Sequence, residues 1–198
     1  MPVTQVYDHY TRAGQWTDGF RFCPSCTTPL TWQERGHRLR PTCPNCGFIQ
    51  YRNPAPTVSI LVVDGDRVLL GRRRGDPGQG TWSFPSGYIE YEDDFLTAAI
   101  REVKEETGLD VEICSILNVM SSFISPRFHF LGVYLLGRVI GGELAANDDM
   151  EGVGWFPIAG PLPEMGFQED VDTLHLLSAG GLAGVPVDLA CAASAARG

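Results

Sequence analysis

The chain has 198 residues, of which 43% are hydrophobic and 20% are charged, and its formal net charge is −9. This length suits one ordinary domain with a small additional module. The acidic balance excludes a basic surface over the whole fold of the kind that binds nucleic acid. No apolar run approaches the roughly 18 residues that span a bilayer, and 1–15 lack the apolar centre of a secretory signal. We therefore expect a soluble, cytoplasmic protein without membrane contact.

Composition divides the chain into four parts. A patternless segment, 1–20, precedes a cysteine- and arginine-rich module, 21–53, which ends at the proline-rich stretch from Asn53 to Pro56. The main domain is predicted over 54–178, and the Ala- and Gly-rich tail 179–198 is expected to be loosely ordered.

Hydrophobic periodicity predicts the elements of the main domain in chain order. Strands are predicted over 57–63, 67–72, 111–120, 128–140 and 152–157. Helices are predicted over 93–107 and 169–178. Strands and helices mix without regular βαβ alternation, which predicts an α+β fold on a mixed sheet.

Four of the six cysteines form two CxxC pairs, Cys23–Cys26 and Cys43–Cys46, separated by 16 residues. Each pair directs two thiolates at one ion, and two pairs complete a tetrahedral four-sulfur site, which predicts a structural zinc ribbon. The alternative is a redox-active dithiol, which usually stands alone near a βαβ unit. Cys114 lies in an apolar stretch and is interpreted as a buried, inert thiol.

The predicted ribbon is locally basic within an acidic protein. Its charged residues are Arg21, Arg35, His37, Arg38, Arg40 and Arg52, against Asp18 and Glu34. Two interpretations remain open. The arginines form either a solvated face of a small module or a surface that contacts a nucleotide, an RNA end or a partner subunit.

The helix predicted over 93–107 has well-marked ends and a core-facing stripe. Asp93 and Asp94 stand where they can cap free N–H groups and meet the positive end of the helix dipole. Gly108 is a usual helix stop. The apolar stripe consists of Phe95, Leu96, Ala99, Ile100 and Val103.

Glu102, Glu105 and Glu106 share one face of this helix, because they are spaced i, i+3 and i+4. Like charges at this spacing destabilise a helix, and a half-buried carboxylate is costly without a partner. A divalent cation removes both penalties, and carboxylates without thiols or imidazoles select Mg²⁺ or Mn²⁺. The alternative is a solvated acidic face balanced by Arg101 and Lys104.

The segment from Gly87 to Leu109 resembles the Nudix box: Gly, five residues, Glu, seven residues, then Arg-Glu-aliphatic-x-Glu-Glu-x-Gly-aliphatic. The matching positions are Gly87, Asp93 (Glu in the family), Arg101, Glu102, Val103, Glu105, Glu106, Gly108 and Leu109. The resemblance implies a Nudix-type α/β/α sandwich with a mixed sheet. It also implies a Mg²⁺- or Mn²⁺-dependent hydrolase that cleaves a pyrophosphate bond with an activated water.

The resemblance further implies a role for each box residue. Glu102, Glu105 and Glu106 would ligate the catalytic Mg²⁺ or Mn²⁺, and one of them would also activate water. Arg101 would orient a box carboxylate with Asp93 as its partner. Asp93 is one methylene shorter than the glutamate of the family, so we expect a weakened contact rather than loss of activity.

Two further features of the metal site come from the resemblance. The backbone of Ser86 and Gly87 would line the site. In the family, another carboxylate often comes from the loop before a late Trp-Phe strand. Glu151 is our candidate, with Asp148 and Asp149 as rivals, and a solvated turn is the alternative interpretation of this loop.

The substrate is predicted only as a class. A zinc ribbon ahead of a Nudix domain is similar to the NADH pyrophosphatase group, but the Ser-Gln-Pro-Trp-Pro-Phe-Pro signature of that group is absent. The comparable segment, 121–127, reads SSFISPR. Pro126, 17 residues past Leu109, is similar to a proline of ADP-ribose-type members. We expect a nucleoside diphosphate linked to another moiety, either ADP-ribose-like or a dinucleotide.

Three residues are candidate substrate ligands. Arg72, Arg73 and Arg74 lie near the box and are each suited to binding phosphate, and Arg74 is our candidate. Phe123 and Arg127 belong to a segment whose aromatic residues, Phe123, Phe128 and Phe130, are suited to stacking on a base. The alternatives are a solvated charge run and core aromatic residues.

A second hypothesis assigns binding rather than catalysis to the chain. It describes a catalytically weak Nudix fold that recognises a nucleotide or an RNA end through the basic ribbon, as a regulator. The complete set of three box glutamates favours the enzyme. In both hypotheses the partner is a nucleotide, nucleic acid is expected only as a capped RNA end, and the resemblance implies a homodimer.

Overall fold

The computed structural model describes residues 4–10, 19–180 and 184–186. Within this part of the chain two compact units are distinguished: Met1–His9 together with Ala55–Gly198, and Tyr10–Pro54. The tail that we expect to be loosely ordered, 179–198, lies outside the described residues except for 179–180 and 184–186.

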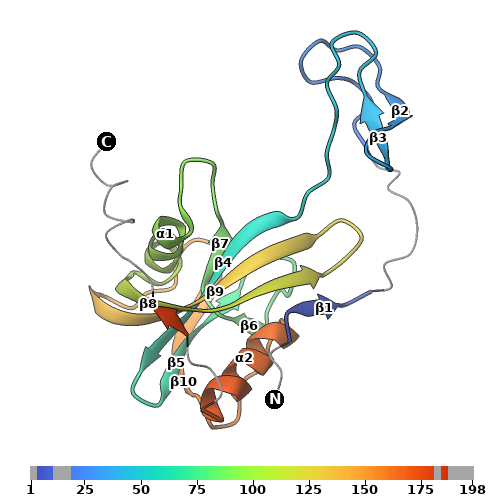
Figure 1. The fold of residues 1–198 in the computed structure, drawn as a ribbon. Helices are drawn as coiled ribbons and strands as arrows, with labels where there is room; N and C mark the ends of the chain where they lie inside the picture. The colour runs from blue at the N-terminus through green and yellow to red at the C-terminus, as the bar shows by residue number, and fades with distance from the viewer. Residues whose placement is uncertain (1–3, 11–18, 181–183, 187–198) are drawn as a thin grey trace. The chain divides into compact units, whose positions relative to one another are not determined.

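The larger unit is built on a mixed sheet of nine strands among the described residues (Figure 1). The strands are β1 (Val6–Asp8), β4 (Ala55–Asp64), β5 (Arg67–Arg73), β6 (Trp82–Ser83), β7 (Ser86–Tyr88), β8 (Leu109–Phe123), β9 (His129–Gly142), β10 (Met150–Pro157) and β11 (Val185–Pro186). Six follow the order β1-β8-β9-β4-β5-β10, with β11 beside β8, β6 beside β5 and β7 beside β4. The pairs β4–β9 and β1–β8 are parallel and the others are antiparallel, which confirms the predicted mixed sheet.

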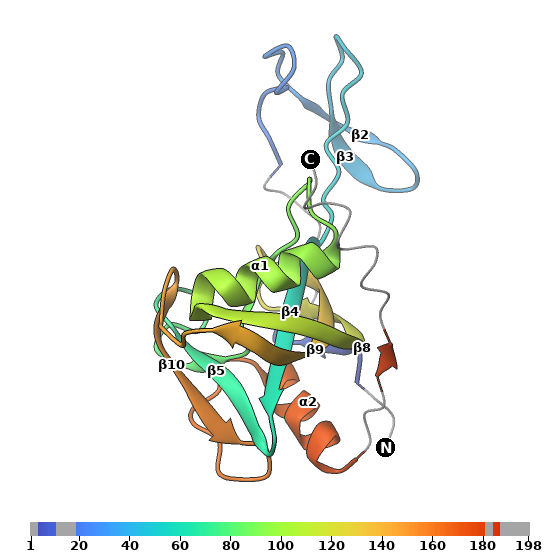
Figure 2. The ribbon, with the colours of Figure 1, turned by 90° about the vertical axis from the view of Figure 1, so that its left-hand side faces the viewer.

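The helices α1 (Phe95–Thr107) and α2 (Gln168–Ser178) cover opposite faces of this sheet (Figure 2). Successive side chains of a strand point to opposite faces, so β4 supplies both cores. Its Val62 packs in the cluster that holds Val103 of α1, whereas Leu61 packs with Leu174 of α2. This layering confirms the predicted sandwich. Within the described residues, neither helix is long and apolar enough to cross a membrane.

The ends of α1 follow from its capping residues. The Oδ1 atom of Asp94 accepts hydrogen bonds from the N–H groups of Leu96 and Thr97 at 2.9 and 3.0 Å, so the helix begins at Phe95. The helix ends at Thr107, because the next residue, Gly108, has a φ of 73° and donates its N–H to the carbonyl of Lys104. Asp93 therefore lies outside the helix.

The interpretation of Cys114 as a buried thiol is wrong. Cys114 is exposed on β8, while Ile113 and Ser115 on either side of it are buried. An apolar stretch of a strand that is covered on one face still directs alternate side chains to the other face. The composition around a cysteine does not determine on which face it lies.

The smaller unit contains the hairpin of β2 (Thr31–Glu34) and β3 (Leu39–Thr42). Two similar turns flank the hairpin. In each turn a cysteine N–H donates to the carbonyl five residues later, from Cys23 to Thr28 at 2.9 Å and from Cys43 to Phe48 at 2.8 Å. The two CxxC pairs thus have the same local backbone arrangement.

Replacing Gly108 by alanine should destabilise the protein more than replacing Gly65. Both glycines have positive φ, 73° and 63°, where an L-residue costs about 1–2 kcal/mol. A Cβ at position 108 would also overlap the carbonyl oxygen of Glu143, whereas a Cβ at position 65 meets nothing within 4 Å. We expect Gly108→Ala to lose about 1–3 kcal/mol more than Gly65→Ala, measured by thermal unfolding followed by circular dichroism. Equal losses of stability in the two variants would show that the segment around Glu143 moves aside without an energetic cost.

Candidate active site

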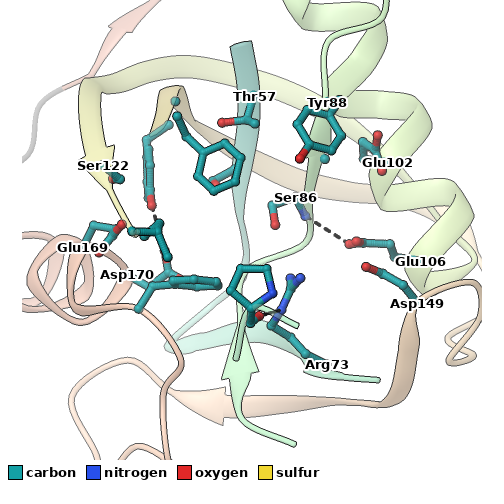
Figure 3. Close-up of a pocket in the computed structure, with 18 of the residues that line it drawn as sticks. Thr57, Arg73, Ser86, Tyr88, Glu102, Glu106, Ser122, Asp149, Glu169 and Asp170 are labelled. Atoms are coloured by element: carbon teal, nitrogen blue, oxygen red, sulfur yellow. Dashed lines mark hydrogen bonds between the residues drawn. The ribbon is translucent and has the colours of Figure 1, made fainter. Parts of the chain in front are cut away.

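A cavity of about 380 Å³ lies in the larger unit, bounded by α1, by β4, β7 and β9, and by the start of α2 (Figure 3). Its lining includes all three box glutamates and residues distant from them in sequence. The lining residues used below are Arg73, Ser86, Gly87, Tyr88, Arg101, Glu102, Glu105, Glu106, Phe130, Tyr134, Asp149, Phe167, Glu169 and Asp170. A cavity of this size suits a nucleotide-sized ligand.

Arg101 links the box carboxylates. Its Nη1 atom donates to Glu102 Oε1 at 2.8 Å and to Glu105 Oε2 at 3.0 Å. Its Nε atom donates to Asp93 Oδ2 at 3.0 Å, and its Nη2 atom donates to the carbonyl of Tyr88. Asp93 reaches the guanidinium despite its short side chain because it precedes the helix instead of belonging to its first turn.

Glu106 is the most buried carboxylate of the box, with 1% of its surface exposed. Its Oε2 atom accepts a hydrogen bond from the N–H of Ser86 at 3.0 Å. Burial raises its pKa well above the usual range, and the nearby carboxylate of Asp149 raises it further. Burial also raises the pKa of Glu102, and the neighbouring Glu105 and Asp149 carboxylates add to this against the opposing effect of Arg101.

This cluster fits a divalent cation. The carboxylate of Asp149 lies close enough to raise the pKa of both Glu102 and Glu106, and these two glutamates are buried. Gly87 lets Glu102 lie against the backbone of β7, because a Cβ there would overlap the Glu102 carboxylate. Oxygen ligands around a site of negative charge suit Mg²⁺ or Mn²⁺, and a bound cation would remove the repulsion.

Glu151 and Asp149 lie in different places relative to the cavity. Glu151 is absent from the cavity lining and pairs with Arg72, at 3.1 Å between Oε1 and Nε. Asp149 lines the cavity beside Glu106 (Figure 3). The register of β10 against β5 shifts between Met150 and Gly152, so Glu151 lies at an irregularity of the strand. The preceding residue, Met150, is buried.

The three candidate substrate ligands do not line this cavity. Arg74 donates to the carbonyl of Met150 at 3.2 Å, and the ring of Phe123 stacks on His129. Arg127 is exposed.

The cavity is lined instead by Arg73, the residue before Arg74, and by Phe130, another aromatic residue of the segment that contains Phe123. Because alternate residues of a strand face opposite sides, a displacement of one position along the sequence changes which side chain enters the cavity. Such a displacement between Arg73 and Arg74 is not visible in a charge run.

Sequence reasoning missed a second acidic pair in the cavity wall, Glu169 and Asp170 of α2. Both are nearly fully buried, with 3% and 2% of their surface exposed. Acidic residues in a first helical turn are common because of the helix dipole, so the sequence has no signal that separates this pair from an ordinary helix start.

The four cysteines of the smaller unit meet at one point. Their Sγ atoms all lie within 4.8 Å of one another. The Cys23–Cys46 and Cys26–Cys43 pairs are both 3.5 Å apart, beyond disulfide length, and all four cysteines are free. Four sulfur atoms in one cluster suit a tetrahedral zinc ion without an open position.

Comparisons with known proteins agree with this architecture. The NUDIX domain model matches residues 53–177, and the model of the Nudix N-terminal zinc ribbon matches 21–52. An ADP-ribose pyrophosphatase from Methanocaldococcus jannaschii is 35% identical over 121 residues, which cover 61% of this chain and 71% of that protein. An NAD-capped RNA hydrolase NudC from Pseudomonas aeruginosa is 32% identical over 157 residues, which cover 77% of this chain and 54% of that protein. This chain thus spans about half the length of the NudC relative.

Solved structures support the fold. A Nudix hydrolase from Nitrosomonas europaea superposes with a TM-score of 0.73 at 23% identity, covering 83% of this chain and 96% of that one. An ADP-ribose pyrophosphatase from Streptococcus suis superposes with a TM-score of 0.52 at 26% identity, covering 63% of this chain and 92% of that one. With the box glutamates gathered in one cavity and a cysteine cluster in a separate unit, this chain belongs to the Nudix hydrolase family.

Proposed function

We propose that the chain hydrolyses the pyrophosphate bond of a nucleoside diphosphate linked to another moiety, such as ADP-ribose. The buried Glu106 carboxylate, grouped with Glu102 and Asp149 in a nucleotide-sized cavity, is the observation that carries this proposal. Burying like charges is costly, and a bound cation offsets that cost. Glu102, Glu105, Glu106 and Asp149 would therefore hold Mg²⁺ or Mn²⁺.

The residues of the chain position the reacting groups. Arg101 holds Glu102 and Glu105 by hydrogen bonds, and the N–H of Ser86 holds Glu106, so three carboxylates keep a fixed arrangement. A divalent cation at these carboxylates would polarise the phosphate oxygens and offset charge on the leaving group. Arg73 also lines the cavity and is suited to the second phosphate. A water molecule attacks one phosphorus, the bond between that phosphorus and the bridging oxygen breaks, and two phosphate monoesters are released.

Two observations support the substrate class. The relatives include an ADP-ribose pyrophosphatase and an NAD-capped RNA hydrolase, and both names denote a nucleoside diphosphate joined to a further group. The segment 121–127 lacks the signature of the NADH pyrophosphatase group, which favours an ADP-ribose-like compound over NAD(H). A capped RNA end is the second substrate to test. The cytoplasmic location and the homodimer remain predictions from the sequence.

A substitution series separates the roles of the three acids. Glu106→Gln should lower kcat at least about 100-fold, because an amide cannot replace the buried anion. Asp149→Asn should also lower kcat strongly, whereas Glu151→Gln should stay within about twofold of the wild type, because Glu151 pairs with Arg72 outside the cavity. Product chromatography with ADP-ribose gives the rates.

The reverse order, with Glu151→Gln inactive and Asp149→Asn active, would assign the further carboxylate to Glu151. Full activity of Glu106→Gln would refute the catalytic site. If the chain is an enzyme, Glu106→Gln should lose turnover and keep its nucleotide binding. If the chain is only a binding module, the wild type itself should hydrolyse no substrate.

Removing divalent cations should abolish hydrolysis. We expect EDTA-treated protein to regain activity with Mg²⁺ or Mn²⁺ and not with Ca²⁺, since Mg²⁺ requires the smaller octahedral oxygen site. A panel of ADP-ribose, NADH, NAD, FAD, dinucleoside polyphosphates, nucleoside triphosphates and NAD-capped RNA, analysed by chromatography, identifies the substrate. Activity that survives EDTA would contradict a metal-dependent mechanism.

The cysteine cluster should hold one zinc ion per chain. Cys26→Ser should lose it, because three thiolates and a hydroxyl bind zinc more weakly than four thiolates. Cys114→Ser is the matched control, since Cys114 is an exposed cysteine outside the cluster. Metal analysis after dialysis measures the stoichiometry. Full zinc content in Cys26→Ser would refute the four-cysteine site.

A further inference from the structure

The hairpin of β2 and β3 in the smaller unit (Figure 1) has two chemically different faces. Residues 21–52 contain five arginines, no lysine and a single acid, Glu34, in a chain with a net charge of −9. Because alternate side chains of a strand point to opposite faces, the register of the hairpin distributes these charges. Glu34 lies opposite Leu39, and Trp32 lies opposite Pro41, so the acid shares its face with apolar residues.

The other face of the hairpin is basic. Arg40 lies opposite Gln33. Arg35 and Arg38, one step closer to the turn on this face, exchange backbone hydrogen bonds at 2.8 and 3.4 Å, and both residues are exposed. Like charges directly opposite each other destabilise a strand pair. The stability of the hairpin therefore does not account for two opposed arginines.

Tyr51 adds an aromatic ring to the basic face. The segment after the second CxxC turn runs back antiparallel to β3, with a bridge between Thr42 and Ile49. The same register places Tyr51 beside Arg40, whose guanidinium carbon lies 4.9 Å from the centre of the ring. Tyr51 is 58% exposed, so its ring is also accessible to a flat group from solution.

Acids of the protein do not neutralise this face. Among the described residues, Arg35, Arg38 and Arg40 form no ion pair with a carboxylate, although the chain has 24 acidic residues. Arg35 donates instead to Gln33 Oε1 at 2.7 Å, and Arg40 donates to the carbonyl of Arg35 at 2.8 Å. Each guanidinium has five N–H donors, so donors remain for an anionic partner.

The flat groups of this face indicate the kind of anion. Guanidinium groups bind phosphate, and both guanidinium planes and aromatic rings stack on unpaired bases. A single-stranded nucleic acid presents phosphates and unpaired bases together, whereas a duplex offers only the edges of its bases. RNA is favoured over DNA because the proposed function places a ribonucleotide in the cavity, and the inference rests on the proposed function for this choice alone.

We propose that the arginine face of the hairpin, formed by Arg35, Arg38, Arg40 and Tyr51, binds single-stranded RNA. The three guanidinium groups bind phosphates, and the ring of Tyr51 stacks on a base. Strand β3 continues directly into the second cysteine pair at Cys43, so the four-cysteine cluster fixes the end of the hairpin. None of these residues belongs to the cavity lining, so RNA affinity and hydrolysis are separate properties of the chain.

The test measures binding of a fluorescein-labelled RNA of about ten uridines by fluorescence anisotropy. With three phosphate contacts, the logarithm of the binding constant should fall against the logarithm of salt concentration with a slope of about −2. The double variant Arg35→Gln with Arg38→Gln should reduce this slope to about −0.7 and weaken binding at low salt at least about tenfold. Tyr51→Ala should weaken binding about fivefold or more, whereas Tyr51→Phe, which keeps the ring, should bind like the wild type.

Two controls match these variants. Arg67→Gln with Arg138→Gln removes the same charge from the larger unit, where the two arginines pair with Asp64 and Glu112. Tyr91→Ala removes a tyrosine that is 97% exposed and also lies in the larger unit. Both controls should bind RNA like the wild type. A zinc content equal to that of the wild type checks that the hairpin variants are folded.

Absence of RNA binding by the wild type, or unchanged affinity in the Arg35 and Arg38 double variant, would overturn the proposal. So would an equal loss in the Arg67 and Arg138 control, because net charge alone would then drive binding. Duplex RNA or polyglutamate that binds as tightly as the single strand would exclude recognition of bases, and DNA that binds more tightly would exclude the assignment to RNA.

Binding and hydrolysis fail separately. The Arg35 and Arg38 double variant should hydrolyse ADP-ribose at the rate of the wild type. If the wild type hydrolyses no compound of the panel, the proposed function is wrong, and the anisotropy measurement still decides whether the arginine face binds RNA.

Discussion

The burial of Glu106 is the constraint on which the rest of this site depends. A carboxylate with 1% of its surface exposed needs donors or a cation. The fold supplies one N–H from Ser86, while the adjacent Arg101 is engaged with Glu102, Glu105 and Asp93. The remaining negative charge is what a divalent cation would neutralise, and the capping of α1 and the close approach at Gly87 keep these groups in position.

The sandwich architecture gives the cavity two chemically different ends. Because β4 alternates its side chains between the two faces of the sheet, α1 and α2 pack on opposite sides. Each helix brings acids to the same cavity. The acids of α1 repel one another and suit a cation and phosphates. Asp170 of α2 is held by Tyr134 and Phe84, and Glu169 pairs with His9 at 3.3 Å.

Residue spacing in the sequence was sufficient to predict the features that a single segment encodes. One helix places Glu102, Glu105 and Glu106 on one face, and two CxxC turns direct four thiolates at one point, because these geometries are local. The mixed sheet was predicted from the order of strands and helices, and the family from the resemblance of the box. The further carboxylate could not be predicted in this way. Asp148 and Asp149 line the cavity, whereas Glu151, at the register shift of β10 between Met150 and Gly152, pairs with Arg72.

The amino-acid sequence by itself determined the placement of the box glutamates on one helix face and the four-cysteine cluster, because each depends on the periodicity of one element or the length of one turn. The Nudix fold followed from the resemblance of the box to that family. The tertiary structure alone decided which side chains enter the cavity from other elements. Arg73, Phe130 and Glu169 line the cavity, whereas Arg74 does not. These choices depend on strand register and on how the first turn of α2 docks, and both arise from contacts between segments far apart in the chain.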